Sequence, residues 1–487
     1  MPLKSLKTNA LLNTVQSVLS IIFPLISFPY VSRVLGVDNI GVYNFSASIV
    51  SYFLLIAGLG ISTYAIREGT QYRNNRLEME KFVSEVFSIN VLSTCISYIF
   101  LFASLLLIPK LEIYKTPILV LSVEIVFTTI GVSWCCNIYE DFLFSSIRSM
   151  VTQIISICLL FLFVKEENDV LIYCCIVVFA NVGANLINYF YVRKRYVKFS
   201  LTIHPNFKKH LKPILIIFLS SIAISIYVSS DTTMIGFMLD ETQVGLYGTS
   251  VKIYNTVKMV LVAVLVVLIP RFSILLNTDE TEQSKKLFSN VFNVLNAMLL
   301  PAIVGLFMMS EEIIYCISGS DFVAASTSLK ILSIAAIFSL YAYLYTQCIL
   351  IPVKREDVVF KATLISAIVN IGLNCFFIPL LGINGAAITT VIAEIIVFIM
   401  SLRCSFKYIK LQNIMPNFVS VIFGCLGIII VCILGKSCLL NMYLRLVVSI
   451  FGAVCVYLVI MLLTKNSIVI TGFKKITQKM SNRRNNR

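Results

Sequence analysis

Residues 446–463 read LVVSIFGAVCVYLVIMLL, eighteen residues without a charge. A run of this length is typical of a helix that crosses a membrane. The whole chain has a similar apolar character: 58% of its 487 residues are apolar and 13% are charged. Soluble domains carry about 25% charged residues, so a soluble enzyme, a disordered chain and an ordinary nucleic-acid binder are excluded. A membrane β-barrel would alternate polar and apolar residues, and the continuous runs favour an all-α polytopic membrane protein.

About 20 apolar residues are needed for each crossing, and on this basis the sequence predicts fourteen transmembrane helices. They lie near residues 9–34, 40–66, 84–108, 116–136, 144–164, 168–191, 213–238, 243–270, 287–309, 324–350, 357–379, 383–404, 416–435 and 443–464. With both termini cytoplasmic, 30 of the 39 basic residues fall in inner segments and six in outer ones. This asymmetry obeys the positive-inside rule and predicts a multi-pass membrane protein with both termini on the inner side.

The net charge of +15 is therefore interpreted as an anchoring signal toward anionic membrane lipid, without a nucleic-acid partner. The fourteen cysteines lie scattered in apolar runs, and the two histidines, His204 and His210, lie in one loop. This spacing predicts buried free thiols and no metal site. No outer loop is long enough for a catalytic domain, so we expect no enzyme activity.

An internal repeat connects two distant segments. Residues 35–49, LGVDNIGVYNFSASI, align with residues 239–253, LDETQVGLYGTSVKI, at an offset of 204. Both segments lie at the outer turn between the first and second spans of a unit. The alignment predicts an N-terminal lobe at 1–200 (spans 1–6) and a C-terminal lobe at 201–410 (spans 7–12). Residues 411–487 would add two further transmembrane helices and a basic cytoplasmic tail.

Polar residues recur at helical spacing within three spans. The first span carries Asn9, Asn13 and Gln16, the second carries Asn44, Ser48 and Ser51, and the eleventh carries Thr363, Ser366, Asn370 and Asn374. Such faces point to a neighbouring helix or to a wet cavity. Their occurrence in corresponding regions favours a hydrated lumen, with interhelical hydrogen bonding as the alternative. Pro24 and Pro29 are expected to bend the first span.

Charges at bilayer depth are costly, about 2.5–3.5 kcal/mol each on insertion scales, and mark functional sites. The first two spans contribute Arg33 and no acid before Val37, while the eighth contributes Lys252 and Lys258. The cavity is therefore predicted to favour an anionic, hydroxyl-rich substrate. The candidate substrate-binding residues are Gln16, Arg33, Asn44, Asp231, Lys252, Asn255 and Lys258. Proton or sodium coupling is assigned to Asp231, Glu124 and Glu394, without a cofactor; a structural Asp231–Lys252 ion pair is the alternative.

Several motifs, in order along the chain, together resemble one family. They are SRVLG at 32–36, IGVY at 40–43, Trp134 with YE at 139–140, SDT at 230–232, VGLY at 244–247, KI at 252–253, and the Asn370, Asn374, IP 378–379, Gly382 and GAA 385–387 pattern. The chain is similar to the Wzx-type polysaccharide flippases of the multidrug/oligosaccharidyl-lipid/polysaccharide exporter superfamily. The resemblance implies two pseudo-symmetric lobes with alternating access. The implied substrate is an undecaprenyl-pyrophosphate-linked oligosaccharide repeat unit, moved from the inner to the outer leaflet for O-antigen, capsule or exopolysaccharide assembly. Implied partners are polysaccharide polymerase and chain-length proteins.

Two other functions remain open at this point. A cation-coupled multidrug antiporter of the same superfamily would share the fold, but the lumen candidates are mostly basic. A membrane glycan polymerase would need a larger outer loop with acidic or histidine side chains, and the predicted outer loops contain no histidine.

Overall fold

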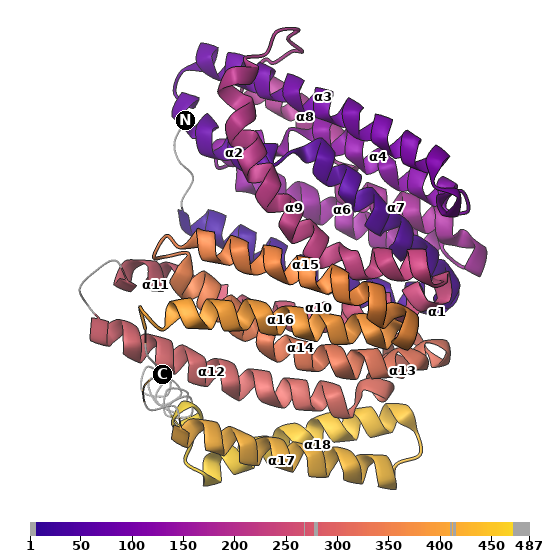
Figure 1. Ribbon diagram of the computed structural model, residues 1–487, viewed down its shortest axis with the longest axis vertical. Coiled ribbons are helices and arrows are strands. Elements are labelled where there is room, and N and C mark those ends of the chain that lie inside the picture. The colour runs from indigo at the N-terminus through magenta and orange to yellow at the C-terminus, as the bar shows by residue number, and fades with distance from the viewer. Residues whose placement is uncertain (1–5, 267, 277–280, 410–411, 413–414, 471–487) are drawn as a thin grey trace, which may run out of the picture. The chain divides into compact units, whose positions relative to one another are not determined.

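The computed structural model describes residues 6–470, except 267, 277–280, 410–411 and 413–414; for 6–22, 220, 224, 264, 270 and 281 it describes the backbone alone. This part of the chain contains helices and turns but no β-strand (Figure 1). The all-α prediction is therefore confirmed for the described residues.

Long helices follow one another with short connections, as a membrane-spanning chain requires. They are α1 (Leu6–Gly58), α2 (Ile61–Gly69), α3 (Arg76–Leu107), α4 (Lys115–Gly131), α5 (Ser133–Ile138), α6 (Phe142–Phe163), α7 (Val170–Val182), α8 (Asn185–Arg195), α9 (Phe207–Met238), α10 (Glu241–Val266), α11 (Ile269–Leu276), α12 (Thr281–Met308), α13 (Ser310–Ser318), α14 (Ser326–Tyr345), α15 (Glu356–Leu381), α16 (Ile383–Ser405), α17 (Met415–Cys438) and α18 (Met442–Leu463). Short 3₁₀ turns lie at Thr70–Tyr72, Pro109–Leu111, Glu167–Asp169 and Ser320–Ala325, and a π-turn lies at Thr346–Leu350.

The described residues of the fourteen predicted segments lie mostly in helices, with breaks at Val132 and at residues 183–184, but the count of fourteen crossings is not confirmed. Within the described residues ten helices are long and apolar enough to cross a membrane, or eleven if the bent pair Phe207–Ala223 and Ser225–Met238 forms one span. Three differences separate eleven from fourteen, and one is that α10 (Glu241–Val266) is not among the qualifying helices. The continuous stretch Phe23–Tyr72 counts once although it covers parts of two predicted spans. In addition, α4 has 17 residues, fewer than the roughly 20 that a crossing needs.

The chain divides into two compact units, Met1–Gly248 and Thr249–Arg487. In the first unit α1 packs against α3, α4, α6 and α9. In the second, α14 packs against α12 and α16, and the hairpin of α17 and α18 packs against α12. Packing thus groups α9 with the helices that precede it. The lobes predicted at 1–200 and 201–410 stay a prediction.

The first two predicted spans are joined without a loop. Helix α1 runs through both, and its one residue with non-helical dihedral angles is Gly36, at φ 74° and ψ 176°. Glycine suits this position because it lacks the Cβ that makes positive φ costly. Pro24 and Pro29 lie inside the helical stretch. The bend at these prolines stays a prediction, and the backbone dihedral break lies at Gly36.

The helix break between α4 and α5 is stabilised by asparagine side chains. Helix α4 ends at Val132, which has a φ of 45°, so the last carbonyls of α4 lose their helical donors. Asn185 donates to the carbonyl of Phe127 at 3.0 Å, and Asn188 donates to the carbonyl of Gly131. Both asparagines lie on α8, directly after the α7–α8 break, so α8 supplies the donors that the end of α4 needs.

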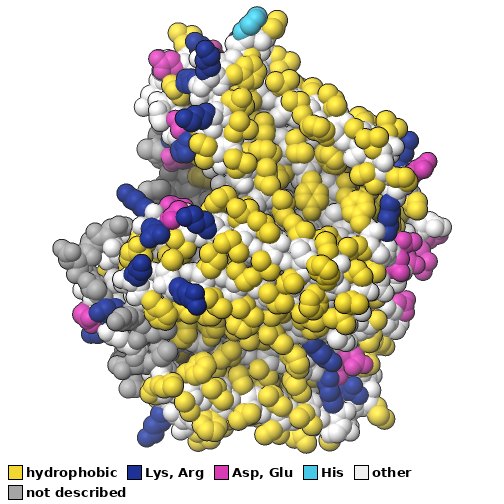
Figure 2. Space-filling model, in the orientation of Figure 1, with side chains coloured by type: hydrophobic (Ala, Val, Ile, Leu, Met, Phe, Trp, Pro, Cys, Tyr) yellow, Lys and Arg dark blue, Asp and Glu magenta, His cyan; other side chains and the backbone are white. Residues whose placement is uncertain are grey.

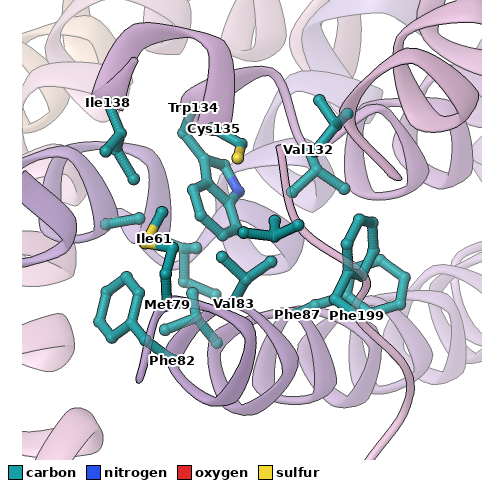
Figure 3. Close-up of a cluster of buried hydrophobic side chains, with 14 of the residues drawn as sticks. Ile61, Met79, Phe82, Val83, Phe87, Val132, Trp134, Cys135, Ile138 and Phe199 are labelled. Carbon is teal, nitrogen blue, oxygen red and sulfur yellow. The ribbon is translucent and has the colours of Figure 1, made fainter. Parts of the chain in front are cut away.

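A hydrophobic cluster fills the region where α2, α3, α5 and α8 meet (Figure 3). Its centre is Trp134, 5% exposed, whose indole ring points toward Met79 and Val83. The segment that follows α8 contributes Phe199, which packs edge-on against Phe87 with ring centroids 5.1 Å apart. This cluster therefore joins sequence-distant helices of the first unit to the segment that leads into α9.

The two C-terminal helices are held by buried charge. Glu312 on α13 is fully buried and pairs with Arg445 at 3.1 Å and Lys436 at 3.4 Å. Arg445 also donates to the carbonyl of Leu439, within the turn between α17 and α18. Removing one partner of a buried pair leaves an uncompensated charge, so these contacts fix the hairpin to the rest of the second unit.

Apolar side chains dominate the molecular surface. Figure 2 shows hydrophobic side chains covering most of the visible face, with charged side chains gathered near helix ends. Leu106 on α3 and Phe451 on α18 are 83% and 69% exposed. Exposed apolar area on this scale is an aggregation liability in water and is expected for helices surrounded by lipid.

We predict that Trp134→Ala will destabilise the first unit by about 3–5 kcal/mol, because it leaves a cavity in a buried cluster. Thermal unfolding of the detergent-solubilised protein, followed by thiol accessibility, measures the effect. Leu106→Ala on α3 is the matched control, since this exposed side chain leaves no cavity. Equal unfolding temperatures for Trp134→Ala and the unmodified protein would contradict the assignment of Trp134 to the core.

Candidate substrate path and coupling carboxylates

The predicted polar stripe of the second span faces α9. Ser48 accepts a hydrogen bond from Thr233 at 3.0 Å, and the Tyr52 hydroxyl lies 3.2 Å from the same Thr233 oxygen. Ser51 donates to the carbonyl of Ser48 at 2.6 Å. At Ser48 the stripe thus makes the interhelical hydrogen bond that was the alternative to a lumen. Thr233, 9% exposed, directly follows the SDT motif at 230–232.

The two aligned repeat segments meet at their glycines. A Cβ on Gly41 would lie 1.8 Å from the carbonyl oxygen of Glu241, and one on Gly245 would lie 2.1 Å from the carbonyl oxygen of Val37. Carbon contacts normally lie about 3.5–4.0 Å apart, so only glycine fits at either position. Gly245 is Gly41 plus the repeat offset of 204, and Glu241 is Val37 plus the same offset. The two contacts are therefore equivalents of each other.

Two further contacts join a residue to its own repeat equivalent. Thr242 donates to the Asp38 carboxylate at 2.5 Å, and a Cβ on Gly248 would lie 2.2 Å from the Asn44 amide nitrogen. A surface that pairs each position with its equivalent is isologous, the pattern of a two-fold axis. These pairs support the repeat alignment, and all of them lie within the first compact unit.

The end of α9 beside this contact is capped by a lysine. Lys110 donates to the carbonyls of Phe237 and Leu239 at 2.9 and 2.7 Å. A cation here satisfies orphan carbonyls and opposes the negative end of the helix dipole. Tyr114, in the same connection between α3 and α4, lies 3.2 Å from the Glu241 carboxylate. The sequence analysis missed this role of Lys110, because it follows from the fold and has no local signal.

The predicted substrate residues of the first unit lie in different settings. Asp231 is 8% exposed and accepts a hydrogen bond from Tyr247 at 2.8 Å. Arg33 is exposed on α1, and Asn44 is half-buried beside Gly248. Gln16 lies outside the residues whose side chains are described.

Glu124, one of the three predicted coupling carboxylates, lies on α4. It accepts a hydrogen bond from Asn181 of α7 at 3.3 Å. Nearby, Tyr43 of α1 and Tyr173 of α7 pack edge to face with centroids 4.8 Å apart. Asn181 is a partner that the sequence analysis missed; an amide in the sixth predicted span was its one signal.

In the second unit the structure pairs two predicted residues with different assigned roles. Lys258 lies 3.3 Å from the carboxylate of Glu394 on α16, and the Tyr254 hydroxyl donates to the same oxygen at 3.4 Å. Glu394 is 5% exposed, so the ammonium group compensates a buried charge. Lys252 and Asn255, on the same helix as Lys258, are exposed. The alternative Asp231–Lys252 pair stays a prediction.

The polar stripe of the eleventh span packs against a neighbouring helix. Asn370 and Asn374 on α15 are nearly fully buried, and both hydrogen-bond to Thr389 on α16. Ser366 donates to the carbonyl of Ala393 at 2.8 Å. The expectation of a hydrated lumen was therefore wrong for Ser366, Asn370 and Asn374, because their polar groups bond between α15 and α16. Thr363 donates to the Val359 carbonyl of its own helix. Within the described residues no cluster of three His, Cys, Asp or Glu side chains could hold a metal ion.

The sequence of this chain matches one protein family and is similar to several named proteins. The sequence model of a family described as "Polysaccharide biosynthesis protein" matches residues 6–276, more than half of the chain. A protein of Escherichia coli K12 named "Putative O-antigen transporter" is 25% identical over 271 residues, which cover 55% of this chain and 65% of that protein. A Haloferax volcanii protein named "Probable low-salt glycan biosynthesis flippase Agl15" is 29% identical over 174 residues, 36% of this chain and 37% of that protein. The chain thus spans less than two thirds of either relative.

Solved structures share the fold at low sequence identity. The lipid II flippase MurJ in an inward closed conformation has a TM-score of 0.74 at 18% identity, with 95% of this chain and 99% of that chain covered. An inward-facing multidrug resistance MATE family transporter of the MOP superfamily has a TM-score of 0.60 at 14% identity, with 79% and 93% covered. The predicted transporter fold class is confirmed.

We predict that Gly41→Ala will weaken the contact between the repeat segments, because its Cβ would overlap the Glu241 carbonyl. Overpacking of this kind costs about 1–3 kcal/mol, so the unfolding temperature should fall. The rate of disulfide formation between Asp38→Cys and Thr242→Cys should fall as well. Gly58→Ala in the same helix is the control, since nothing lies within 4 Å of its added Cβ. If the two variants behave alike, the close approach at Gly41 is not real.

We also predict strong coupling between Lys258 and Glu394. Lys258→Met or Glu394→Gln alone leaves a buried charge without its partner, which costs about 3–5 kcal/mol. The double variant should recover most of the unfolding temperature, because neither charge remains. Losses that simply add in the double variant would show that the two groups do not interact.

Proposed function

This chain belongs to the polysaccharide biosynthesis protein family, and from that premise we propose that it is a flippase for lipid-linked oligosaccharides. It would move undecaprenyl-pyrophosphate-linked repeat units from the inner to the outer leaflet for O-antigen, capsule or exopolysaccharide assembly. The names of the two sequence relatives, an O-antigen transporter and a glycan biosynthesis flippase, support this substrate class.

The observation that carries the proposal is the contact between repeat equivalents. Transporters built from repeats around an axis work by rocking one repeat against the other. Asp38 with Thr242 and Gly41 with Gly245 supply a contact through which the two repeats touch. This contact consists of closely packed glycines and the hydrogen bond between Thr242 and Asp38. Such a contact can close one end of a transport path and open again when the two repeats move apart.

The exposed basic residues support an anionic substrate. Lys252 is exposed near the middle of α10, where an ammonium group facing hydrocarbon would be costly. A water-filled path would remove this cost, and Asn255 adds a polar group less than one turn away. We propose that Lys252 meets the pyrophosphate, with Asn255 toward the sugar. Arg33, Asn44 and Gln16 stay predicted substrate-binding residues. Lys258 then serves chiefly to compensate Glu394.

The three predicted coupling carboxylates have different partners, so the cost of changing their charge differs. Proton uptake by Glu394 would leave Lys258 as an uncompensated charge in a buried site. Glu124 is held by the neutral amide of Asn181, so it can change charge with less cost than Glu394. Asp231 accepts a hydrogen bond from Tyr247 and keeps its predicted coupling role. We propose Glu124 and Asp231 as the groups for proton or sodium coupling.

Location and partners complete the proposal. The apolar helices make this a multi-pass membrane protein. We propose that it lies in the bacterial inner membrane with both termini cytoplasmic, and that it delivers substrate to a polysaccharide polymerase and chain-length proteins. It would carry out no covalent chemistry itself.

The multidrug antiporter remains the second candidate. Its fold is shared, as the MATE transporter match indicates, so fold does not separate the two functions. The named sequence relatives and the basic residues on α1 and α10 favour the flippase. Overexpression of an antiporter would give resistance to cationic dyes, and its deletion would leave surface glycan unchanged.

We predict that Lys252→Ala will abolish surface polymer at unchanged protein abundance and cause lipid-linked repeat units to accumulate in the inner leaflet. Lys252→Arg, which keeps the charge, should retain most export. Glycan blotting and extraction of lipid-linked sugars, set beside a deletion strain, measure both effects. Normal polymer in the Lys252→Ala strain would remove Lys252 from the path, and a deletion strain without accumulated lipid-linked units would argue against the flippase itself.

A further inference from the structure

The connection between α8 and α9 is an extended segment that the predicted function leaves without a role. Residues 196–206 contain no helix, and they cross the boundary that the sequence predicts between the lobes at 1–200 and 201–410. A linker that only joins two repeats needs few contacts. This one is bonded along its length to α3.

Three backbone amides of the segment, two residues apart, donate to three side chains of α3 that are four residues apart. The pairs are Lys198 to Glu80 at 3.1 Å, Ser200 to Ser84 at 3.2 Å and Thr202 to Ser88 at 2.8 Å. Two residues of extended chain advance about 6.6 Å, and four residues of helix advance about 6 Å. The two spacings match, so an extended chain can bond to each successive turn of α3.

The segment ends in a buried chain of hydrogen bonds. His210, in the first turn of α9, is fully buried. Its Nε2 lies 2.7 Å from the Glu85 carboxylate on α3, and its Nδ1 lies 2.6 Å from the Tyr64 hydroxyl on α2. A neutral imidazole satisfies both partners, because Nδ1 accepts from the tyrosine while Nε2–H donates to the carboxylate. One side chain thereby joins three helices.

Apolar and cation–π contacts reinforce the same attachment. Val197 is fully buried in the cluster around Trp134, and Lys209 lies 4.9 Å from the centre of the Tyr72 ring. Farther along α9, Ile217 packs so closely on Gly60 that a Cβ there would lie 2.7 Å from it. Helix α9 itself begins at Asn206, whose side chain accepts from the amide of Lys209 at 3.2 Å.

We propose that residues 196–210 form a strap that fastens α9 to α2 and α3, and that His210 is its positioning residue. In sequence, α9 is the first helix of the second repeat. Because the strap fastens it, α9 moves together with the first repeat. It holds one end of α9, and Lys110 caps the other, with Asp231 and Thr233 between them. The strap stays attached throughout transport, a statement that rests on the proposed flippase function.

Amide hydrogen exchange tests the strap without any transport assay. The amides of Lys198, Ser200 and Thr202 should be protected although they lie outside helices, because hydrogen-bonded amides exchange only when the bond opens. His210→Ala should speed their exchange about tenfold, the effect of losing about 1.4 kcal/mol. His204→Ala is the matched control, since His204 is the chain's other histidine and lies exposed in the same segment.

Conservative variants separate positioning from folding. His210→Gln can place an amide near Nε2 and still reach Glu85, so it should restore protection at the three amides, whereas His210→Ala should not. Rapid exchange of these amides in the unmodified protein would overturn the strap. An equal effect of His204→Ala and His210→Ala would overturn the role of His210. Both results would leave the flippase proposal untouched.

A disulfide tests whether the strap stays attached during transport. Ser88→Cys with Thr202→Cys would link the strap to α3 where the Thr202 amide meets the Ser88 hydroxyl. Export of surface polymer should continue after oxidation, at the level of each single-cysteine variant under the same oxidant. Loss of export on oxidation, with recovery on reduction, would show that the strap must detach in each cycle and would overturn the proposal.

Discussion

The close approach of Gly41 and Gly245 is the constraint from which the rest of the first unit follows. Two helix segments can bring their backbones into contact only where neither carries a Cβ. Because the two glycines are repeat equivalents, one geometric requirement is met twice by the same residue type. Once these backbones touch, Asp38 comes within reach of Thr242, and Ser48 and Tyr52 come within reach of Thr233. The polar contacts around the seam are thus consequences of the glycine pair.

A second theme is that buried polar groups are satisfied between helices. Asn185 and Asn188 bond to the carbonyls left open where α4 ends, Lys110 does the same for α9, and Glu312 is compensated by two cations. Without water in the bilayer core, an unsatisfied group costs several kcal/mol. Irregular backbone is therefore found where another helix supplies a donor or a charge. Polar residues in such a chain are first explained by these local needs, and only the remainder are candidates for substrate contact.

This distinction explains which parts of the sequence analysis succeeded. Apolar runs predicted the helices, because length and composition determine where a helix can lie in lipid. The repeat offset predicted that Gly41 and Gly245 correspond. Periodicity could not tell a wet face from a packed one, so Asn370 and Asn374 were assigned to a lumen although they pair with Thr389 on the next helix. Charge alone could not tell Lys258, which compensates Glu394, from the exposed Lys252. In both cases the deciding information is the partner, which lies far away in the sequence.

The grouping of α9 with the first unit changes how the repeat should be understood. By sequence, α9 opens the second repeat; by contact, it packs on α1 and α2 and is bonded through His210 to α2 and α3. If repeats moved strictly as the sequence divides them, these contacts would have to break in every cycle, including a fully buried carboxylate–imidazole bond. Breaking such a bond leaves the buried Glu85 carboxylate without its imidazole partner, at a cost of about 1–3 kcal/mol. A movement that keeps α9 with the first unit, and flexes the chain beyond it, avoids that cost.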